Sequence, residues 1–172
     1  MKLTDVFSTN YAANTVVCKL WGLVGSPTEF ILALSVYRAL TRSYEAWTCW
    51  IYSDEEYRRQ VADGGPHQIG LFALVPQLQV DKVGIVDLTI FVPGLNKHRP
   101  VVAVETDGHA FHERTVDQAS NDRRRDRILQ RFRIPVFRFT GTDVVRRSEE
   151  SAHEIVDFIE ERAQLSAWRR MH

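Results

Sequence analysis

The sequence predicts one α/β domain with a mixed central sheet of about four strands flanked by helices. Three observations support this prediction. A capped amphipathic helix comes first, three short apolar runs rich in β-branched residues follow, and a charged helical stretch of crossover length then leads to a fourth apolar run. The chain has 172 residues, which is the usual length of a single domain.

The first helix is expected to begin at Ser26-Pro27-Thr28-Glu29. Ser at the N-cap, Pro at the first helical position and Glu at the capping-box position are the common residues of a helix start. We expect this helix to continue to about Arg42, because its apolar residues recur at helical spacing. Residues 44–62 are expected to be helical as well, and Asp63-Gly64-Gly65-Pro66 then ends the helical part.

The middle of the chain reads as a β-meander, because its apolar runs are separated by short turn sequences. A helix follows the third strand and leads into a fourth. A crossover of this length predicts that the third and fourth strands are parallel. The expected strands are Leu71–Val80, Val83–Val92, Val101–Thr106 and Pro135–Phe139, and the expected later helices are 115–132 and 149–165.

Composition excludes several classes of protein. Lys and Arg number 22 and Asp and Glu also number 22, so the chain lacks the basic excess of a protein that coats nucleic acid. Residues 99–147, however, hold eleven Arg, no Lys and seven acids, and Arg is suited to bidentate contact with phosphate. The alternative is a solvated helix face with salt bridges. Two cysteines, no apolar run of spanning length and no secretion signal lead us to expect a cytoplasmic protein that does not enter membranes.

Acidic residues inside apolar strands are the main functional signal. Asp87 interrupts Gly84-Ile85-Val86-Asp87-Leu88-Thr89-Ile90-Phe91, and Glu105 and Asp107 end the next strand on one of its faces. Buried carboxylates must be paired, protonated or bound to a metal, and oxygen ligands favour Mg²⁺ or Mn²⁺. The three acids therefore predict a metal site for phosphate chemistry. The competing interpretation is that Asp87 and Glu105 pair with Arg residues of 123–127.

With these acids, the stretches VETDGHAFHERT, DRRRDRIL and VFRFTG resemble the PD-(D/E)xK restriction-endonuclease-like nucleases, and most closely the branch of the very short patch mismatch repair endonucleases. The resemblance covers about residues 26–160, and it implies an αβββαβ core to which residues 1–25 and 44–66 are peripheral additions. It also implies that Asp87, Glu105 and the Thr106 carbonyl hold the metal. Glu29 resembles the helix-borne acid of such sites, but it fits a capping box equally well.

The chain departs from the family pattern where Asp107 stands in place of a Lys. An Asp cannot supply the positive charge of that Lys. The very short patch branch has histidine near this strand end, so the resemblance makes His112 the candidate general acid or base and His109 the second candidate.

The crossover helix adds candidate substrate-binding residues. On a helical wheel, the buried stripe of Ile128 and Phe132 continues toward the helix start through polar side chains, which suggests a polar pocket. The alternative is a salt bridge from Arg124 or Arg125 to Glu29 or Asp87. The candidates for contact with the scissile phosphate are Arg125, Arg124, Asn121 and Gln118.

These observations predict a Mg²⁺-dependent or Mn²⁺-dependent endonuclease that acts on nucleic acid, with DNA favoured over RNA by the resemblance. No motif of a rival enzyme class is present. The alternative is a nucleic-acid-binding module on the same scaffold that has lost catalysis, because the Lys is missing. Homodimerisation is left open by the sequence.

Overall fold

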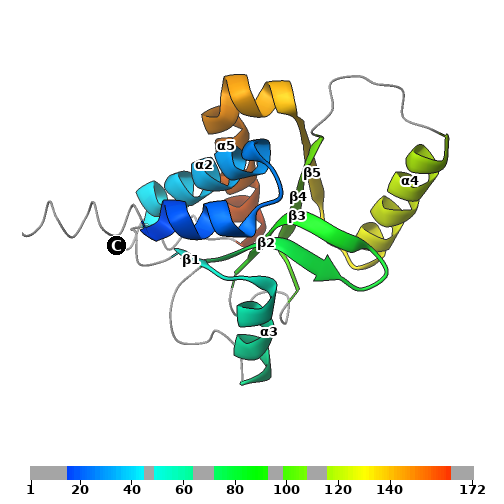
Figure 1. The fold of residues 1–172 in the computed structure, drawn as a ribbon, viewed down its shortest axis with the longest axis horizontal. Coiled ribbons are helices and arrows are strands. Elements are labelled where there is room, and N and C mark those ends of the chain that lie inside the picture. Colours follow the sequence, from blue (N-terminus) through cyan, green and yellow to red (C-terminus); the bar gives the residue numbers. More distant parts are fainter. Residues whose placement is uncertain (1–14, 45–48, 64–71, 93–98, 108–115, 164–172) are drawn as a thin grey trace, which may run out of the picture.

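The computed structural model describes residues 15–44, 49–63, 72–92, 99–107 and 116–163, and it has the predicted α/β architecture (Figure 1). A helix at residues 15–23 precedes the elements that Figure 1 labels. These elements are α2 (Pro27–Tyr44), β1 (Cys49–Ile51), α3 (Asp54–Ala62), β2 (Phe72–Val80), β3 (Gly84–Phe91), β4 (Val102–Asp107), α4 (Val116–Arg131), β5 (Val136–Thr140) and α5 (Gly141–Ala163).

A mixed sheet with strand order β1-β2-β3-β4-β5 forms the centre of the fold. β2, β3 and β4 form the antiparallel meander, and β5 pairs with β4 in parallel, as the crossover helix predicted. The prediction of helix over 44–62 is wrong in part. Cys49–Ile51 pairs in parallel with Phe72–Leu74 as a fifth strand, and α3 begins only after Ser53, which forms a capping box with Glu56.

The last helix also differs from its prediction, because it begins at Gly141 rather than near 149. The Asp143 amide donates to Thr140 Oγ1 at 3.1 Å, and the Asp143 carboxylate accepts from the Thr140 amide at 3.2 Å. This reciprocal cap starts a helix directly after β5. Arg147 is non-helical, so the element bends there before it continues to Ala163.

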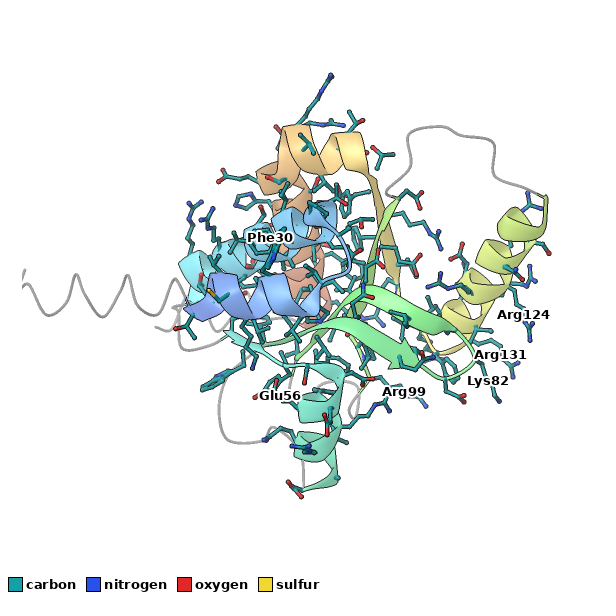
Figure 2. The ribbon with its side chains drawn as sticks, viewed as in Figure 1. Phe30, Glu56, Lys82, Arg99, Arg124 and Arg131 are labelled. Carbon is teal, nitrogen blue, oxygen red and sulfur yellow. The ribbon has the colours of Figure 1, made fainter. Side chains whose placement is uncertain are left out.

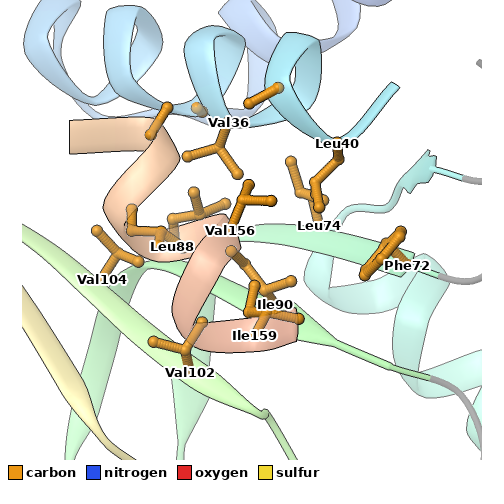
Figure 3. Close-up of a cluster of buried hydrophobic side chains, with 14 of the residues drawn as sticks. Val36, Leu40, Phe72, Leu74, Leu88, Ile90, Val102, Val104, Val156 and Ile159 are labelled. Carbon is orange, nitrogen blue, oxygen red and sulfur yellow. The ribbon is translucent and has the colours of Figure 1, made fainter. Parts of the chain in front are cut away.

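The main core lies between the sheet and the pair α2 and α5 (Figure 3). Val36 and Leu40 of α2 contact this cluster from one side, and Leu88 and Ile90 of β3 supply the facing sheet surface. Each such side chain contributes about 1.5 to 3 kcal/mol when it is buried. Leu20, which is fully buried, joins the same cluster, so residues 15–23 pack with the core.

The other face of the sheet is covered by α3 and α4. Tyr57 of α3 packs with β2 and β3, and Leu129 of α4, which is fully buried, packs against Val86 and Ala103. Among the residues that the structure describes, no helix is both long and apolar enough to cross a membrane.

The β2–β3 hairpin twists sharply at Gln77 and Asp87. Gln77 has φ 51°, and the regular pairing of Pro76 with Leu88 and of Leu78 with Val86 places Gln77 opposite Asp87. Leu88 packs on the α2 and α5 side, yet Val86 packs on the α4 side, although residues two apart in a regular strand share a face. The twist therefore turns Asp87 toward the edge of β4. A non-glycine residue with positive φ costs about 1 to 2 kcal/mol, so other contacts must stabilise it.

Candidate functional site

Asp87 lies where β3 and β4 separate. Leu88 and Val104 form the last pair of the β3–β4 ladder on this side, so β3 supplies no backbone partner for the Thr106 amide. The Asp87 carboxylate replaces that partner, since its Oδ2 accepts from the Thr106 amide at 2.8 Å and from Thr106 Oγ1 at 3.2 Å. The backbone N–H and C=O of one strand residue point to the same side in the sheet plane. The Thr106 carbonyl therefore faces the same gap between β3 and β4.

Glu105 lies on the α4 side of this gap and is only 7% exposed. Its Oε1 accepts from Arg125 Nη2 at 2.7 Å, and its Oε2 is 3.3 Å from Arg138 Nη2. Burial raises the pKa of the Glu105 carboxyl above its ordinary value, and the negative charges of Asp87 and Asp126 act in the same direction. The two guanidiniums oppose this rise in the pKa.

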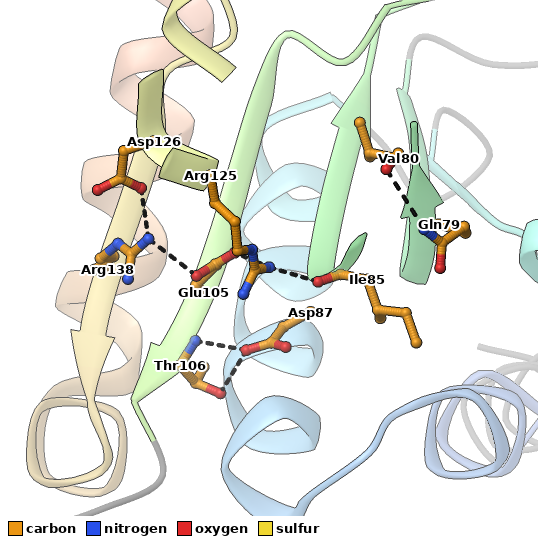
Figure 4. Close-up of polar contacts among 9 residues, drawn as sticks. All are labelled: Gln79, Val80, Ile85, Asp87, Glu105, Thr106, Arg125, Asp126 and Arg138. Carbon is orange, nitrogen blue, oxygen red and sulfur yellow. Dashed lines mark hydrogen bonds and ion pairs between the residues drawn. The ribbon is translucent and has the colours of Figure 1, made fainter. Parts of the chain in front are cut away.

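The Arg125 guanidinium lies between β4 and β3 at the gap (Figure 4). Its Nη2 donates to the Glu105 carboxylate and also, at 2.6 Å, to the Ile85 carbonyl of β3. Its Nε is buried and has no hydrogen-bond partner among the residues that the structure describes. Leu129, one turn later on α4, is buried against the sheet and holds this face of the helix toward Glu105.

Glu29 approaches the gap from the opposite side. Its Oε2 accepts from the Gly25 amide and from Gln77 Nε2, both at 2.7 Å, while its own amide donates to Ser26 Oγ at 3.3 Å. Glu29 therefore contributes to the helix start and also contacts the strand. Together with Asp87 it borders a narrow hollow that is too small for a water molecule. Gln77 joins the two sides, because it is both the twisted residue of β2 and the partner of Glu29.

The other candidate residues either lie farther from the β3–β4 gap or fall outside the described residues. Asp107, half-buried at the end of β4, is paired in register with Thr140 of β5. Arg124 and Asn121 are exposed, and Figure 2 shows Arg124 on the outer side of α4. The prediction that the buried stripe of this helix continues through these two residues is therefore wrong, whereas its other members Arg125, Ile128 and Phe132 are half-buried. The fully buried residue of the stripe is Leu129. His109 and His112, like the Gln118 side chain, lie outside the described residues.

The two interpretations of the acids each match part of the arrangement. Asp87, Glu105 and Thr106 come together at one gap, as the metal-site prediction requires. Glu105 also pairs with Arg125, as the competing interpretation requires, and the salt bridge expected from Arg125 to Glu29 or Asp87 is made to Glu105 instead.

Sequence reasoning missed three contributors to the site: Arg138, Gln77 and the Ile85 carbonyl. Arg138 interrupts the apolar strand Val136–Thr140 in the way that Asp87 interrupts β3, so the same signal identifies it. Gln77 follows Pro76, and a Pro within an apolar strand indicates an irregularity there. No signal in the side chains marks a backbone carbonyl such as that of Ile85.

The donor set at the gap fits a hard divalent cation, because it consists of the Asp87 and Glu105 carboxylates and the Thr106 carbonyl. Arg125 Nη2 lies between one of these donors, the Glu105 carboxylate, and the carbonyl oxygen of Ile85. The conformation described is nevertheless closed to a metal. Both Glu105 oxygens face guanidiniums, and no group of three or more His, Cys, Asp or Glu side chains gathers for an ion among the described residues.

Comparisons of the chain with protein-family models, with curated proteins and with solved structures found no match.

Proposed function

We propose that the protein is a metal-dependent endonuclease that hydrolyses phosphodiester bonds, with DNA as the substrate. The observation that supports this proposal best is the seating of a cationic nitrogen at the β3–β4 gap, 2.7 Å from the Glu105 carboxylate and 2.6 Å from the Ile85 carbonyl. Asp87 lies at the same gap and adds to the negative charge around Glu105. Such a concentration of oxygen atoms is a general feature of cation sites.

In this proposal Asp87, Glu105 and the Thr106 carbonyl hold Mg²⁺ or Mn²⁺. When bound, the ion supplies a water of lowered pKa and polarises the phosphate. Thr106 keeps the Asp87 carboxylate in place through two hydrogen bonds, and Glu29 borders the hollow beside it and orders Gln77. Asp107, on the Glu105 side of β4, adds further negative charge near this end of the strand.

The start of α4 is proposed to contact the scissile phosphate. Arg124 is exposed and Arg125 already reaches the gap, so both guanidiniums can approach an anion bound there. Asn121 and Gln118 precede them on the same helix, and His109 lies in the segment between β4 and α4. Arginine beside a transferring phosphate stabilises the charge that develops on its oxygens.

A cleavage assay tests this function. The purified protein is incubated with supercoiled plasmid, single-stranded DNA and RNA in Mg²⁺, Mn²⁺ or EDTA. We expect DNA cutting that requires the metal and that Asp87→Asn and Glu105→Gln abolish. Asp157→Asn and Glu154→Gln are the matched controls, since both acids are exposed on α5, and they should cut like the wild type. Equal cutting by all variants would mean a contaminating nuclease and would contradict the proposal.

His112 is proposed to act as general acid or base in the same reaction. His112→Ala is expected to lower the rate of cleavage by ~10- to 100-fold, which is typical for loss of a supporting group at a metal site. Cleavage at the wild-type rate in this variant would remove His112 from the mechanism. His109→Ala in the same assay shows whether a second histidine contributes.

A nucleic-acid-binding module without catalysis is the second candidate. The observation in its favour is that both Glu105 oxygens already face arginines, so neither oxygen is open to a metal in the described conformation. This candidate predicts DNA retention that is unchanged by EDTA, together with no cutting in either metal. A gel-shift series with the same DNA in Mg²⁺ and in EDTA, run beside the cleavage assay, therefore separates the two functions.

A further inference from the structure

We propose that Arg125 occupies the cation position of the β3–β4 gap while no divalent ion is bound, and that binding of the ion releases this side chain toward the substrate phosphate. This inference rests on the proposed function, because it takes Glu105 to be a metal ligand. It concerns how the site changes between two states, which the proposed function leaves open.

The contacts of Arg125 are those of a substitute ion. One nitrogen, Nη2, bridges the Glu105 carboxylate at 2.7 Å and the Ile85 carbonyl at 2.6 Å, so it joins β4 to β3 across the point where their ladder ends. The same guanidinium carries an unsatisfied donor, since its Nε is buried and finds no partner within the described part of the chain. A buried donor without a partner is unfavourable, so Arg125 is bound at this position less strongly than a fully hydrogen-bonded guanidinium would be.

Arg138 contacts Glu105 less closely than Arg125 does. Its Nη2 is bound to Asp126 at 2.6 Å and is 3.3 Å from Glu105, so its main partner is another acid (Figure 4). It is part of β5, whose register places it beside Glu105. Arg138 therefore stays in place whether or not Glu105 binds a metal, and it is the natural control.

Competition for one oxygen atom also favours release of Arg125. Arg125 Nη2 is bonded to Glu105 Oε1 at 2.7 Å, and this is the atom that the ion would take. The ion and Arg125 both need Glu105 Oε1, and like charges at that distance repel. The freed Arg125 side chain, already 29% exposed, can then reach phosphate from α4.

The first test measures Mn²⁺ affinity without nucleic acid, by electron paramagnetic resonance of the free ion. Arg125→Gln is expected to bind Mn²⁺ ~10- to 100-fold more tightly than the wild type, since the ion no longer displaces a charge-assisted hydrogen bond. Arg138→Gln is expected to differ from the wild type by no more than ~3-fold, because its bond to Glu105 is long. Thermal melts check that each variant is folded.

Equal Mn²⁺ affinity in the wild type and Arg125→Gln would overturn the role of Arg125 and leave the metal site intact. Absence of Mn²⁺ binding in all three proteins would overturn the metal site, and with it the proposed function.

The wild-type protein gives a second test that needs no folded variant. Nitrogen-15 NMR of the arginine side chains follows Arg125 while Mg²⁺ is added, and carbon-13 NMR follows the Glu105 carboxyl. We expect both signals to change at the same Mg²⁺ concentration, with the Arg125 guanidinium gaining rotational freedom. A change in Glu105 with Arg125 unmoved would contradict the proposal, and no change in either would contradict the metal site.

Discussion

Replacement of Asp87 separates its role in the sheet from its proposed role at the metal. In Asp87→Ala the Thr106 amide and hydroxyl lose the carboxylate that accepts their hydrogen bonds at 2.8 and 3.2 Å. A hydrogen bond to a charged group contributes about 1.5 to 3 kcal/mol, and water replaces part of it here because Thr106 is half-buried. We therefore expect a loss of about 2 kcal/mol in the free energy of unfolding, which for a chain of this length lowers the Tm by about 4 to 8 °C.

Asp87→Asn is the matched change, because its amide oxygen can accept the same two hydrogen bonds while the charge is removed. We expect its Tm to stay within about 2 °C of the wild type, in line with retained hydrogen bonds, and its DNA cleavage to be abolished. Calorimetry in EDTA measures the first effect, and the plasmid assay measures the second.

Two results would refute this reasoning. An Asp87→Ala protein that melts with the wild type would mean that the carboxylate does not stabilise the end of β4. Cleavage by Asp87→Asn at the wild-type rate would mean that the charge of Asp87 has no part in the reaction.

Three further predictions concern the rest of the fold. The hydrogen bond from the Ser53 backbone lowers the pKa of Glu56. The stabilisation that ionised Glu56 gives is therefore present above the unfolded pKa of about 4.3 and is lost as the pH falls through the lower folded pKa. Urea melts of Glu56→Gln should show a free energy of unfolding about 0.5 kcal/mol below the wild type at pH 7, a small value because solvent screens this exposed group, and no difference near pH 3. Burial raises the pKa of the Cys49 thiol, while Cys18 is exposed. Ellman's reagent should therefore titrate one thiol in the native protein and two in denaturant. Rapid reaction of both thiols in the native protein would disprove the burial of Cys49. Leu129→Ala should lower the free energy of unfolding by about 2 to 5 kcal/mol in denaturant melts, since this fully buried side chain packs α4 against the sheet. A loss below about 0.5 kcal/mol would show that Leu129 does not hold α4 in place.

Most of the fold was predictable from the sequence because its signals are local. Ser26-Pro27-Thr28-Glu29 marks a helix start by the chemistry of four neighbouring residues, and α2 begins at Pro27. The meander followed from apolar runs and turns, and the parallel pairing of β4 with β5 followed from the length of the helix between them. β1 was missed because a run of three residues becomes a strand only through its pairing with β2, more than twenty positions later.

The candidate site was predictable in its acids but less so in their partners. Asp87 and Glu105 stand out because a charge inside an apolar strand needs a partner. Which partner each one finds depends on the tertiary arrangement, since Arg124 and Arg125 are adjacent in sequence and only the second reaches Glu105. The sharp twist at Gln77 likewise depends on long-range contacts, including the bond to Glu29 from another element.

Diffraction from crystals soaked in MnCl₂, recorded for its anomalous signal, tests the central claim most directly. That claim is that the β3–β4 gap binds a divalent cation. We predict an anomalous peak bonded to the Asp87 and Glu105 carboxylates and the Thr106 carbonyl, with the Arg125 guanidinium moved away from Glu105. No peak at the gap, with Arg125 and Arg138 still bonded to Glu105 in saturating Mn²⁺, would contradict it.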